Sequence, residues 1–492
     1  MRGFLSVGQS LALGLFFAAI LFACAASTRK SSPHESPQHP DLIKPANSDL
    51  PFPDVIDSSG WDLSVHENDS VPGVTAPAQT TKSLLPGPRL EGVRLRPRPK
   101  DLPEKIHVLL LRGNKSISIY SLGEMEIISE NASDAKSPAH APALTKILKM
   151  RGRFVIRRSG AGFDIEQGNK KLESTSARRL RLISVNPYNL IDLGGTVYRG
   201  GLHVLASSEG NLQVVNVLGV EDYLRGVLPY ELGKVDREGL EALKALAIVA
   251  RTYAYKRMQQ PGNSDFHVFS DVQDQVYKGV KGEYLLSDRA VWETRSMAVL
   301  FGDSLAQCFY SSTCGGSTSS KHEVWGGDSI PYLVSRSDMD ESGEAYCQSS
   351  KYSTWNEEWT PVQLSGILKR NLHSAGVSDF SNFSSLLGLD VITRATCGRV
   401  RILKITTDKG QILVKGDKVR WALRPVGQEA KILSSAWVNL KMGDGKISAV
   451  GHGFGHGVGL CQVGAIGRAH AGQTCKQIIE AYFKGVQVVE FK

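Results

Sequence analysis

Between residues 104 and 217, the hydrophobic positions form short runs separated by Gly or Asn, which favour turns. This spacing is typical of β-strands. The segments 198–205 and 212–217 flank Glu209-Gly210-Asn211 and predict a β-hairpin. Further strands are predicted over 105–111, 116–120, 126–129, 154–157 and 180–185, with a turn at 112–115.

Helical spacing of hydrophobic residues begins near residue 220. The longest amphipathic helix is predicted over 237–258, with Asp236 as its N-cap. Because strands and helices do not alternate regularly, the chain is predicted to be α+β and strand-rich, with a few amphipathic helices. The other expected elements are helices over 220–227, over 289–297 after Asp288 and from the N-cap Thr474 to Phe483, strands over 298–301 and 306–311, an irregular stretch over 312–350, and a Gly-rich loop over 451–467.

The N-terminus has the pattern of an export signal. Arg2 precedes an apolar run of about sixteen residues, which is shorter than the ~20 residues that a membrane-spanning helix needs. The run ends in Leu21-Phe22-Ala23-Cys24, so residues 1–23 are predicted to be a lipoprotein-type signal peptide and Cys24 the lipidated residue. An ordinary cleaved signal or an uncleaved anchor fits the same residues. Each interpretation exports the protein, which argues against a nucleic-acid partner.

Residues 24–103 are predicted to be a Pro/Ser-rich disordered tether, since thirteen of the 21 prolines lie there. Residues 104–492 are predicted to fold, with a strand-rich part over 104–216 and a catalytic core over 217–492. The chain of 492 residues is 41% hydrophobic and 22% charged, which excludes wholesale disorder. Its net charge of +9 suits an anionic polymer such as cell wall. The basic cluster over 146–181 is either a solvated face or a surface for that polymer.

Cysteine usage agrees with export. Besides Cys24 there are six cysteines, an even number, and none is spaced as C-x-x-C. Disulfides persist outside the cytoplasm. Cys314 and Cys347 flank one loop-rich stretch and are the favoured pair, while free buried thiols are the alternative. The remaining four are Cys308, Cys397, Cys461 and Cys475.

Six ordered blocks carry a family resemblance. They are VLGVEDYLRGVLPYEL (217–232), EALKA (241–245) with ARTYA (250–254), DQVYKG (274–279), YSSTCGGST (310–318), VWGG (324–327) with PYL (331–333), and GHGFGHGVGLCQVGA (451–465). Together they resemble the SpoIID/LytB family of peptidoglycan-acting proteins over about residues 104–490. Six blocks in the expected order make the resemblance specific, whereas a single block would be weak.

The resemblance implies a lytic transglycosylase that cuts the MurNAc–GlcNAc bond of glycan strands, with a preference for strands stripped of stem peptides. The residue that matches the family's catalytic Glu is Glu231, with Leu232 where Met is usual. Such an enzyme can use one carboxylic acid, which protonates the leaving oxygen and then takes a proton from the sugar's C6 hydroxyl. Apolar neighbours of Glu231 favour the raised pKa that this role needs. The alternative is a surface Glu, and the adjacent Glu221 and Asp222 are interpreted as structural.

A glycan-binding groove would need further polar and aromatic residues, and aromatic faces stack on sugar rings. His452 and His456 are four residues apart, but the glycines between 451 and 459 argue against the helix that a metal pair at this spacing needs. Some family members carry zinc in the stretch that matches 266–274, which here has one His and no Cys. No metal and no cofactor are therefore predicted. The groove candidates are Gln275, Ser311, Trp325, His456 and Gln462.

The family resemblance leaves rival functions open. LytB-type relatives are described as modifiers of wall amidases, so this protein is alternatively a non-catalytic glycan-binding modifier of such an amidase. A third interpretation is a lipoprotein that only grips denuded strands. The predicted partners are peptidoglycan glycan strands, a wall amidase in the rival case, and the membrane through the lipid on Cys24. The predicted location is the cell envelope, facing the periplasm or wall.

Overall fold

The computed structural model describes residues 93–130, 144–207, 209–260, 265–378, 380, 382–428 and 431–492. The predicted signal peptide, Cys24 and most of the predicted tether lie outside these residues and stay predictions. Among the described residues, no helix is both long enough and apolar enough to cross a bilayer.

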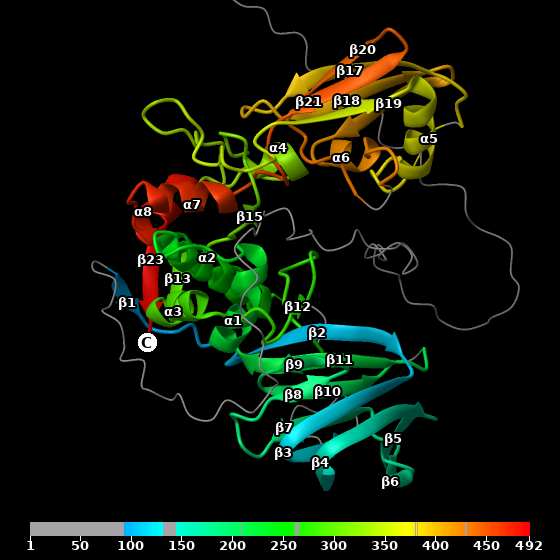
Figure 1. Ribbon diagram of the computed structural model, residues 1–492, viewed down its shortest axis with the longest axis vertical. Coiled ribbons are helices and arrows are strands. Elements are labelled where there is room, and N and C mark those ends of the chain that lie inside the picture. Colours follow the sequence, from blue (N-terminus) through cyan, green and yellow to red (C-terminus); the bar gives the residue numbers. More distant parts are fainter. Residues whose placement is uncertain are drawn as a thin grey trace, which may run out of the picture. The chain divides into compact units, whose positions relative to one another are not determined.

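Most strands before residue 220 join one sheet (Figure 1). Alternate residues of its strands face the core: Leu180 and Leu182 are fully buried, whereas Arg181 between them is only partly buried. In spatial order the sheet contains β12 (Val268–Phe269), β2 (Lys105–Asn114), β11 (Leu212–Gly219), β10 (Gly201–Ala206), β7 (Arg179–Ser184), β3 (Ser116–Glu130), β4 (Leu144–Ser159), β5 (Gly162–Gln167) and β6 (Lys170–Thr175), with β8 (Ile191–Leu193) paired to β3 and β9 (Thr196–Tyr198) paired to β8.

The predicted hairpin is confirmed, because β10 and β11 pair in antiparallel register from Gly201↔Val217 to Ala206↔Leu212. The turn predicted at 112–115 is wrong, since β2 continues through Asn114 and a single residue separates it from β3. β3 pairs with both β4 and β7. Because β3 is hydrogen-bonded on both of its edges, it continues as a strand through polar residues at which the sequence pattern predicts the strand to end.

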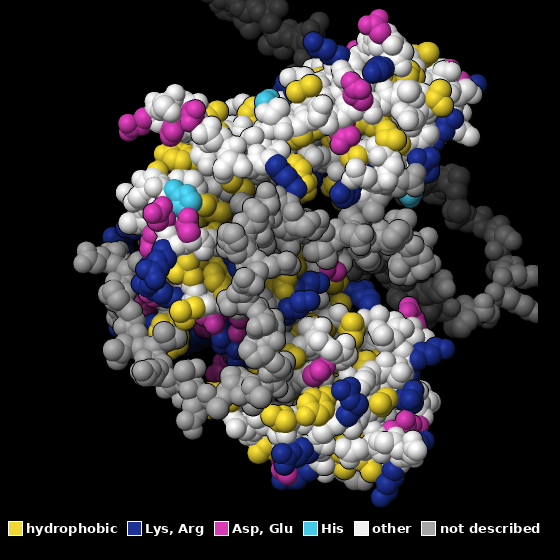
Figure 2. Space-filling view, in the orientation of Figure 1, with side chains coloured by type: hydrophobic (Ala, Val, Ile, Leu, Met, Phe, Trp, Pro, Cys, Tyr) yellow, Lys and Arg dark blue, Asp and Glu magenta, His cyan; other side chains and the backbone are white. Residues whose placement is uncertain are grey.

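Basic side chains of this sheet are paired with acids. Arg179 and Arg181 both lie within 4.0 Å of the Glu130 carboxylate, and Arg157 donates to Glu166 over 2.9 Å. Figure 2 shows Lys and Arg side chains interspersed with apolar and acidic ones over the visible face of these strands. These pairs favour a solvated face over a surface dedicated to an anionic polymer.

Among the helices of the described residues, α1, α2, α3, α7 and α8 pack on one another, and α1 also packs on this sheet. α1 contacts β2 and β11, and α2 contacts α1, α3, α7 and α8 (Figure 1). In chain order they are α1 (Val220–Glu231), α2 (Leu240–Gln259), α3 (Leu285–Glu293), α4 (Lys321–Trp325), α5 (Pro361–Asn371), α6 (Lys418–Ala422), α7 (Gln462–His470) and α8 (Cys475–Tyr482).

The bounds of α1 and α2 differ from the prediction. The sequence predicts Asp236 as the N-cap of the long helix, but α2 begins just after Gly239. The Asp236 carboxylate instead accepts a hydrogen bond from the Gly239 N–H (2.9 Å), which holds a turn ahead of the helix. The short helix predicted over 220–227 continues to Glu231, with Pro229 in its last turn.

The prediction for α3 is also wrong, whereas that for α8 is confirmed. α3 begins at Leu285, so Asp288 lies inside its first turn and does not cap it. The Asp288 carboxylate accepts a hydrogen bond from Arg225 of α1 over 2.8 Å. At α8, Thr474 is the N-cap, and its side chain and that of Gln477 form a reciprocal capping box.

Folded structure begins within the segment predicted to be a tether. β1 (Arg94–Arg96) pairs in parallel with β23 (Gln487–Phe491), and β23 pairs on its other edge with β13 (Met297–Phe301), which turns into β14 (Ser304–Leu305). Leu102 is buried in the main core. The last residues of the predicted tether therefore belong to the folded part of the chain.

A second hydrophobic core lies between residues 355 and 449, and the sequence pattern does not predict it. It contains the buried side chains of Trp359, Leu364 and Leu403. Both cores belong to one compact unit, and the predicted α+β class is confirmed. The elements that form the second core are β16 (Trp355–Trp359), α5, β17 (Leu386–Arg394), β18 (Val400–Thr407), β19 (Gly410–Lys415), α6, β20 (Val438–Gly443) and β21 (Lys446–Gly451).

The second core gives a stability prediction. Leu403 is fully buried, so we expect Leu403→Ala to lower the free energy of unfolding by about 2–5 kcal/mol. Leu413 lies on the neighbouring strand and is 51% exposed, so Leu413→Ala should change it by less than about 0.5 kcal/mol. Urea unfolding followed by tryptophan fluorescence measures both. Equal losses in the two variants would contradict the assignment of this core.

Candidate active site

Glu231 is the last residue of α1, which continues directly from β11. The helix is fixed at both ends. Near Glu231, Leu228 and Leu232 are buried in the main core. At the start of the helix, the fully buried Arg251 of α2 donates hydrogen bonds to both carboxylate oxygens of Glu221, at 3.0 and 2.6 Å. Glu221 therefore has the structural role that the sequence predicts, and it fixes the helix that carries Glu231.

The Glu231 carboxyl group accepts hydrogen bonds from two remote segments. The backbone N–H of Val276 donates to Oε1 over 2.8 Å. The side-chain amide of Gln462 donates to Oε2 over 3.2 Å, from 231 residues further along the chain. Each oxygen of the carboxyl group therefore has its own donor.

Tyr310 is a third group at this carboxyl. The Gln275 amide nitrogen donates to the Tyr310 hydroxyl oxygen over 3.0 Å, and the Gln275 amide oxygen accepts from the Tyr223 hydroxyl over 3.1 Å. The Tyr310 hydroxyl keeps its own hydrogen, which forms the hydrogen bond to Glu231. Gln275 is fully buried, so it contacts these tyrosines and orients Tyr310.

The surroundings of Glu231 favour its protonated form. Burial raises the pKa of Glu231 to about 7, against hydrogen bonds from Val276, Gln462 and Tyr310 that favour the carboxylate. Its place at the C-terminal end of α1 acts in the same direction as burial, since the helix dipole is negative there. The residue as a whole keeps partial exposure, so solvent still reaches it. A carboxyl group of this kind exchanges its proton near neutral pH.

Gln462 reaches the carboxyl group because the predicted Gly-rich loop ends early, in α7. Gln462 is the first residue of that helix, and Cys461 is its N-cap, with a sulfur that accepts from the Gly464 N–H over 3.2 Å. Glycines mask the helix in the sequence. Gly467 cannot be replaced by a larger residue without a clash, because a Cβ at this position would lie 2.1 Å from the Tyr346 carbonyl oxygen.

A two-residue parallel pairing joins the two halves of the site. β15 (Tyr310–Ser311) pairs with β22 (Leu460–Cys461), and Gln462 follows β22 directly. The pairing therefore places Tyr310 and Gln462 at the same carboxyl group. Ser311 is buried, and its hydroxyl accepts a hydrogen bond from the Gly457 N–H over 3.2 Å, so it supports the Gly-rich backbone.

Trp325 and His456 form an aromatic pair, with ring centroids 4.9 Å apart. The Phe309 ring also packs against Trp325, with their ring centroids 5.0 Å apart. Trp325 is 43% exposed, so much of its indole faces solvent. His456 Nδ1 accepts a hydrogen bond from the Val458 N–H (3.0 Å), and burial lowers the His456 pKa to about 4. Its ring is therefore neutral at pH 7.

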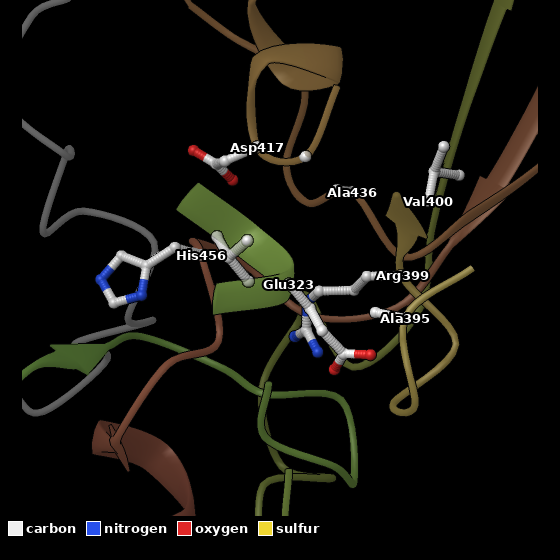
Figure 3. Close-up of a pocket in the computed structure, with 9 residues that line it drawn as sticks. Glu323, Ala395, Arg399, Val400, Asp417, Ala436 and His456 are labelled. Carbon is white, nitrogen blue, oxygen red and sulfur yellow. The ribbon is translucent and has the colours of Figure 1, made fainter. Parts of the chain in front are cut away.

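A small pocket lies beside His456. Its wall comes from α4 and from segments of the second core, and includes Glu323, Arg399 and Asp417. Figure 3 shows the His456 ring directed away from the end of the pocket where Glu323 and Arg399 lie. Glu231 is not among the lining residues, so this pocket is separate from the carboxyl group.

The backbone between His452 and His456 is bent, as the glycines predict. Gly453 and Gly455 have φ values of 81° and 100°, which exclude a helix. The two imidazoles have different neighbours: His452 lies 5.5 Å from Trp437, and His456 packs on Trp325.

The sequence predicts some of the site residues and misses others. Two contributors at the carboxyl group are missed by sequence reasoning, Tyr310 and the Val276 backbone N–H. Tyr310 stands beside Ser311 in a recognised block, so the motif could have indicated it. A backbone donor has no signature in the sequence. The predicted residues form two groups: the first, at the carboxyl, is Glu231, Gln275 and Gln462; the second, around the Gly-rich segment, is Ser311, Trp325 and His456.

Comparison with known proteins gives two family models and several relatives. A model described as Stage II sporulation protein matches residues 208–301, and one described as a domain of unknown function matches residues 343–459. An uncharacterized protein of Brachyspira hyodysenteriae (strain ATCC 49526 / WA1) is 30% identical over 300 residues, covering 61% of this chain and 74% of that protein.

Two relatives from Bacillus subtilis (strain 168) have informative names. An amidase enhancer is 28% identical over 54% of this chain and 40% of its own length. A stage II sporulation protein D is 28% identical over 56% of this chain and 76% of its own length. The chain belongs to the SpoIID/LytB family. The SpoIID match contains Glu231 and Gln275 but ends before Tyr310 and Gln462, while the second match includes the whole of the second core.

We expect the Glu231 carboxyl group to titrate near pH 7. Carbon-13 NMR of protein labelled at glutamate carboxyls measures this, with the signal assigned by its absence in Glu231→Gln. Gln462→Leu should raise the Glu231 pKa further, because it removes a hydrogen bond to the charged form. Gln273→Leu, at an exposed position, is the control. A Glu231 titration near ~4.3, the ordinary value for glutamate, would contradict the site described.

Proposed function

We propose that this SpoIID/LytB protein is a peptidoglycan lytic transglycosylase that uses Glu231 as its single acid and base. The observation that carries the proposal is a carboxyl group with a pKa of about 7, held by three donors on a residue that is partly exposed. A general acid works best when its pKa is near the operating pH. The stage II sporulation protein D relatives support the assignment.

The reaction exchanges one bond for another without consuming water. Glu231 donates its proton to the oxygen that joins MurNAc C1 to GlcNAc C4, and the C1–O bond breaks through an oxocarbenium-like transition state. The C6 hydroxyl oxygen of the same MurNAc then bonds to C1. The Glu231 carboxylate takes the hydroxyl proton and returns to its acid form. The products are a 1,6-anhydro-MurNAc end and a free GlcNAc C4 hydroxyl.

The donors around Glu231 suit both halves of this cycle. Val276 N–H, Gln462 and Tyr310 stabilise the carboxylate that forms when the proton leaves, while burial makes that proton easy to regain. Gln275 is a positioning residue, since its amide fixes the Tyr310 hydroxyl. Removing any one of the three donors should therefore change the pKa of the acid as well as its placement.

The aromatic group formed by Trp325, His456 and Phe309 is the proposed place where sugar rings stack. Trp325 offers an exposed indole face, and the neutral His456 offers an uncharged ring beside it. Ser311 is proposed to act indirectly, because its hydroxyl oxygen accepts a hydrogen bond from the Gly457 N–H and so supports the Gly-rich backbone. Denuded glycan strands, which lack the bulk of stem peptides, are the expected substrate.

A cell-wall substrate fits the predicted export through residues 1–23. The predicted lipid on Cys24 would anchor the protein in the membrane, and the predicted tether would let the folded part reach the wall. A second candidate function is binding to glycan and modification of a wall amidase without cleavage. The observation that favours it is the similarity to a protein named amidase enhancer. The two functions differ in whether Glu231 turns substrate over.

The first prediction compares Glu231→Gln with the matched control Glu238→Gln, which changes an exposed carboxylate on the turn before α2. Purified protein is incubated with glycan strands that have, or lack, stem peptides, and products are read by mass spectrometry. We expect anhydro-MurNAc ends from wild type and Glu238→Gln, and at least a ~100-fold loss in Glu231→Gln, in line with the typical contribution of general acid catalysis.

Other outcomes of this experiment have distinct meanings. Reducing ends without anhydro product would identify a hydrolase and would require a second carboxylate. Glycan binding without cleavage, unchanged in Glu231→Gln, would replace the enzyme by the amidase-modifier function.

The second prediction concerns pH. Glu231 must be protonated to start the reaction, so kcat/KM should be level below pH 7 and fall by about tenfold per pH unit above it. Gln462→Leu removes a hydrogen bond to the carboxylate, so it should shift this descending limb to higher pH. Initial rates of anhydro-product formation between pH 5 and 9, measured by chromatography, test both. An activity that rises through pH 7 would assign Glu231 a role as base only.

A further inference from the structure

Three cysteines and an aspartate meet inside the protein, apart from the Glu231 carboxyl group. Cys314, Cys347, Cys461 and Asp338 are all buried. Their sulfur and carboxylate oxygen atoms lie within 4.8 Å of one another. Cys314 Sγ is 3.7 Å from Cys347 Sγ and 3.0 Å from Asp338 Oδ2.

The spacing of the Cys314 and Cys347 sulfurs matches a tetrahedral metal site. Zinc–sulfur bonds of about 2.3 Å at tetrahedral angles separate two sulfurs by about 3.8 Å. The observed distance between Cys314 and Cys347 is 3.7 Å. The three sulfurs and the oxygen, all within 4.8 Å of one another, supply the four ligands that a tetrahedral ion takes.

The predicted disulfide between Cys314 and Cys347 is not formed, and all six cysteines of the described residues are free. A bond between these two sulfurs would require them to approach to about 2.05 Å. It would also leave the Cys461 and Asp338 side chains without a role in the cluster. A four-ligand site uses all four side chains, which a disulfide does not.

The Asp338 carboxylate is already oriented as a metal ligand is. Its Oδ1 accepts hydrogen bonds from Arg468 Nε and the Tyr482 hydroxyl, both over 2.9 Å. Its Oδ2 is the oxygen that faces Cys314. Such outer hydrogen bonds orient ligands and are typical of metal sites.

Backbone N–H groups are directed at the sulfurs. Those of Cys314 and Gly464 approach Cys461 Sγ at 3.1 and 3.2 Å, and that of Gly316 approaches Cys314 Sγ at 3.3 Å. Such N–H groups around sulfur belong to the outer shell of hydrogen bonds that orients the ligands of a metal site.

We propose that Cys314, Cys347, Cys461 and Asp338 bind one Zn²⁺ ion in a closed, structural site. Three thiolates select a soft or borderline metal, and tetrahedral geometry with a carboxylate oxygen selects zinc among these. The three thiols release their protons to solvent as the metal binds. This proposal departs from the sequence expectation of no metal, and the site lies outside the stretch 266–274 to which the family resemblance directs attention.

The site would tie together segments that shape the active site. Cys461 precedes Gln462 directly, and Cys314 lies four residues after Tyr310. Zinc bound there holds both next to Glu231. Binding of the metal itself does not depend on the proposed glycan cleavage, so its test needs no glycan.

The experiment uses the purified full chain, reduced and stripped of metal with a chelator. Zn²⁺ is titrated in competition with a chromophoric chelator, and Co²⁺ is titrated to detect thiolate-to-cobalt charge-transfer absorption. We expect saturation at one ion per chain for each metal, and a higher melting temperature for the zinc-loaded chain than for the stripped chain.

Variants locate the ion. Cys347→Ser should abolish the charge-transfer band or reduce affinity by more than a hundredfold. Tyr482→Phe, which removes only an outer hydrogen bond to Asp338, should weaken zinc binding by about 10–100-fold. Cys475→Ser, a buried cysteine outside the cluster, is the matched control and should bind as wild type does.

The wild-type titration keeps the test decisive even if Cys347→Ser fails to fold. A folded, reduced wild-type chain that takes up no Zn²⁺ and gives no charge-transfer band would overturn the proposal. A Cys314–Cys347 disulfide found by peptide mass spectrometry in the exported protein, without bound metal, would overturn it as well. Equal loss of binding in Cys475→Ser would also do so, because the ion would then lie elsewhere.

Discussion

The carboxyl group of Glu231 gives up much of its water and receives three hydrogen bonds from the protein, and the arrangement of the site follows from that exchange. Burial alone would keep the group protonated, while the donors alone would keep it ionised. With both present, its pKa lies near 7. This balance requires the end of α1, the Val276 backbone, Tyr310 and Gln462 to meet at one point.

The strand-rich sheet matters to this balance because it fixes α1. The helix starts at the end of β11 without an intervening loop, so the register of the sheet determines where Glu231 lies. Two charged contacts hold the helix against its neighbours. Arg251 binds Glu221, and Arg225 binds Asp288 of α3. Glu221, which competes with Glu231 in the sequence, therefore serves to place it.

Sequence reasoning succeeds where the deciding interaction is local. The hairpin of β10 and β11 and the capping box at Thr474 are both set within a few residues. It fails where a distant partner decides. Asp288 resembles an N-cap, but its partner Arg225 is 63 residues away. Gln275 resembles a groove residue, yet packing of remote tyrosines buries it. The second core depends on one such distant pairing, because β16 joins β21 from far along the chain, whereas β17, β18 and β19, and likewise β20 and β21, pair with their sequence neighbours.

The weakest link in the site is the pairing that joins Tyr310 to Gln462. A ladder of two residues contributes too little to hold two loops in register by itself. The surrounding contacts must supply the rest: the Ser311 hydroxyl on the Gly457 backbone, and the Cys461 sulfur that caps α7. Cys461 belongs both to this pairing and to the buried cysteine cluster. The cluster is therefore joined to the donors around Glu231 by one short segment of backbone, since Cys461 directly precedes Gln462.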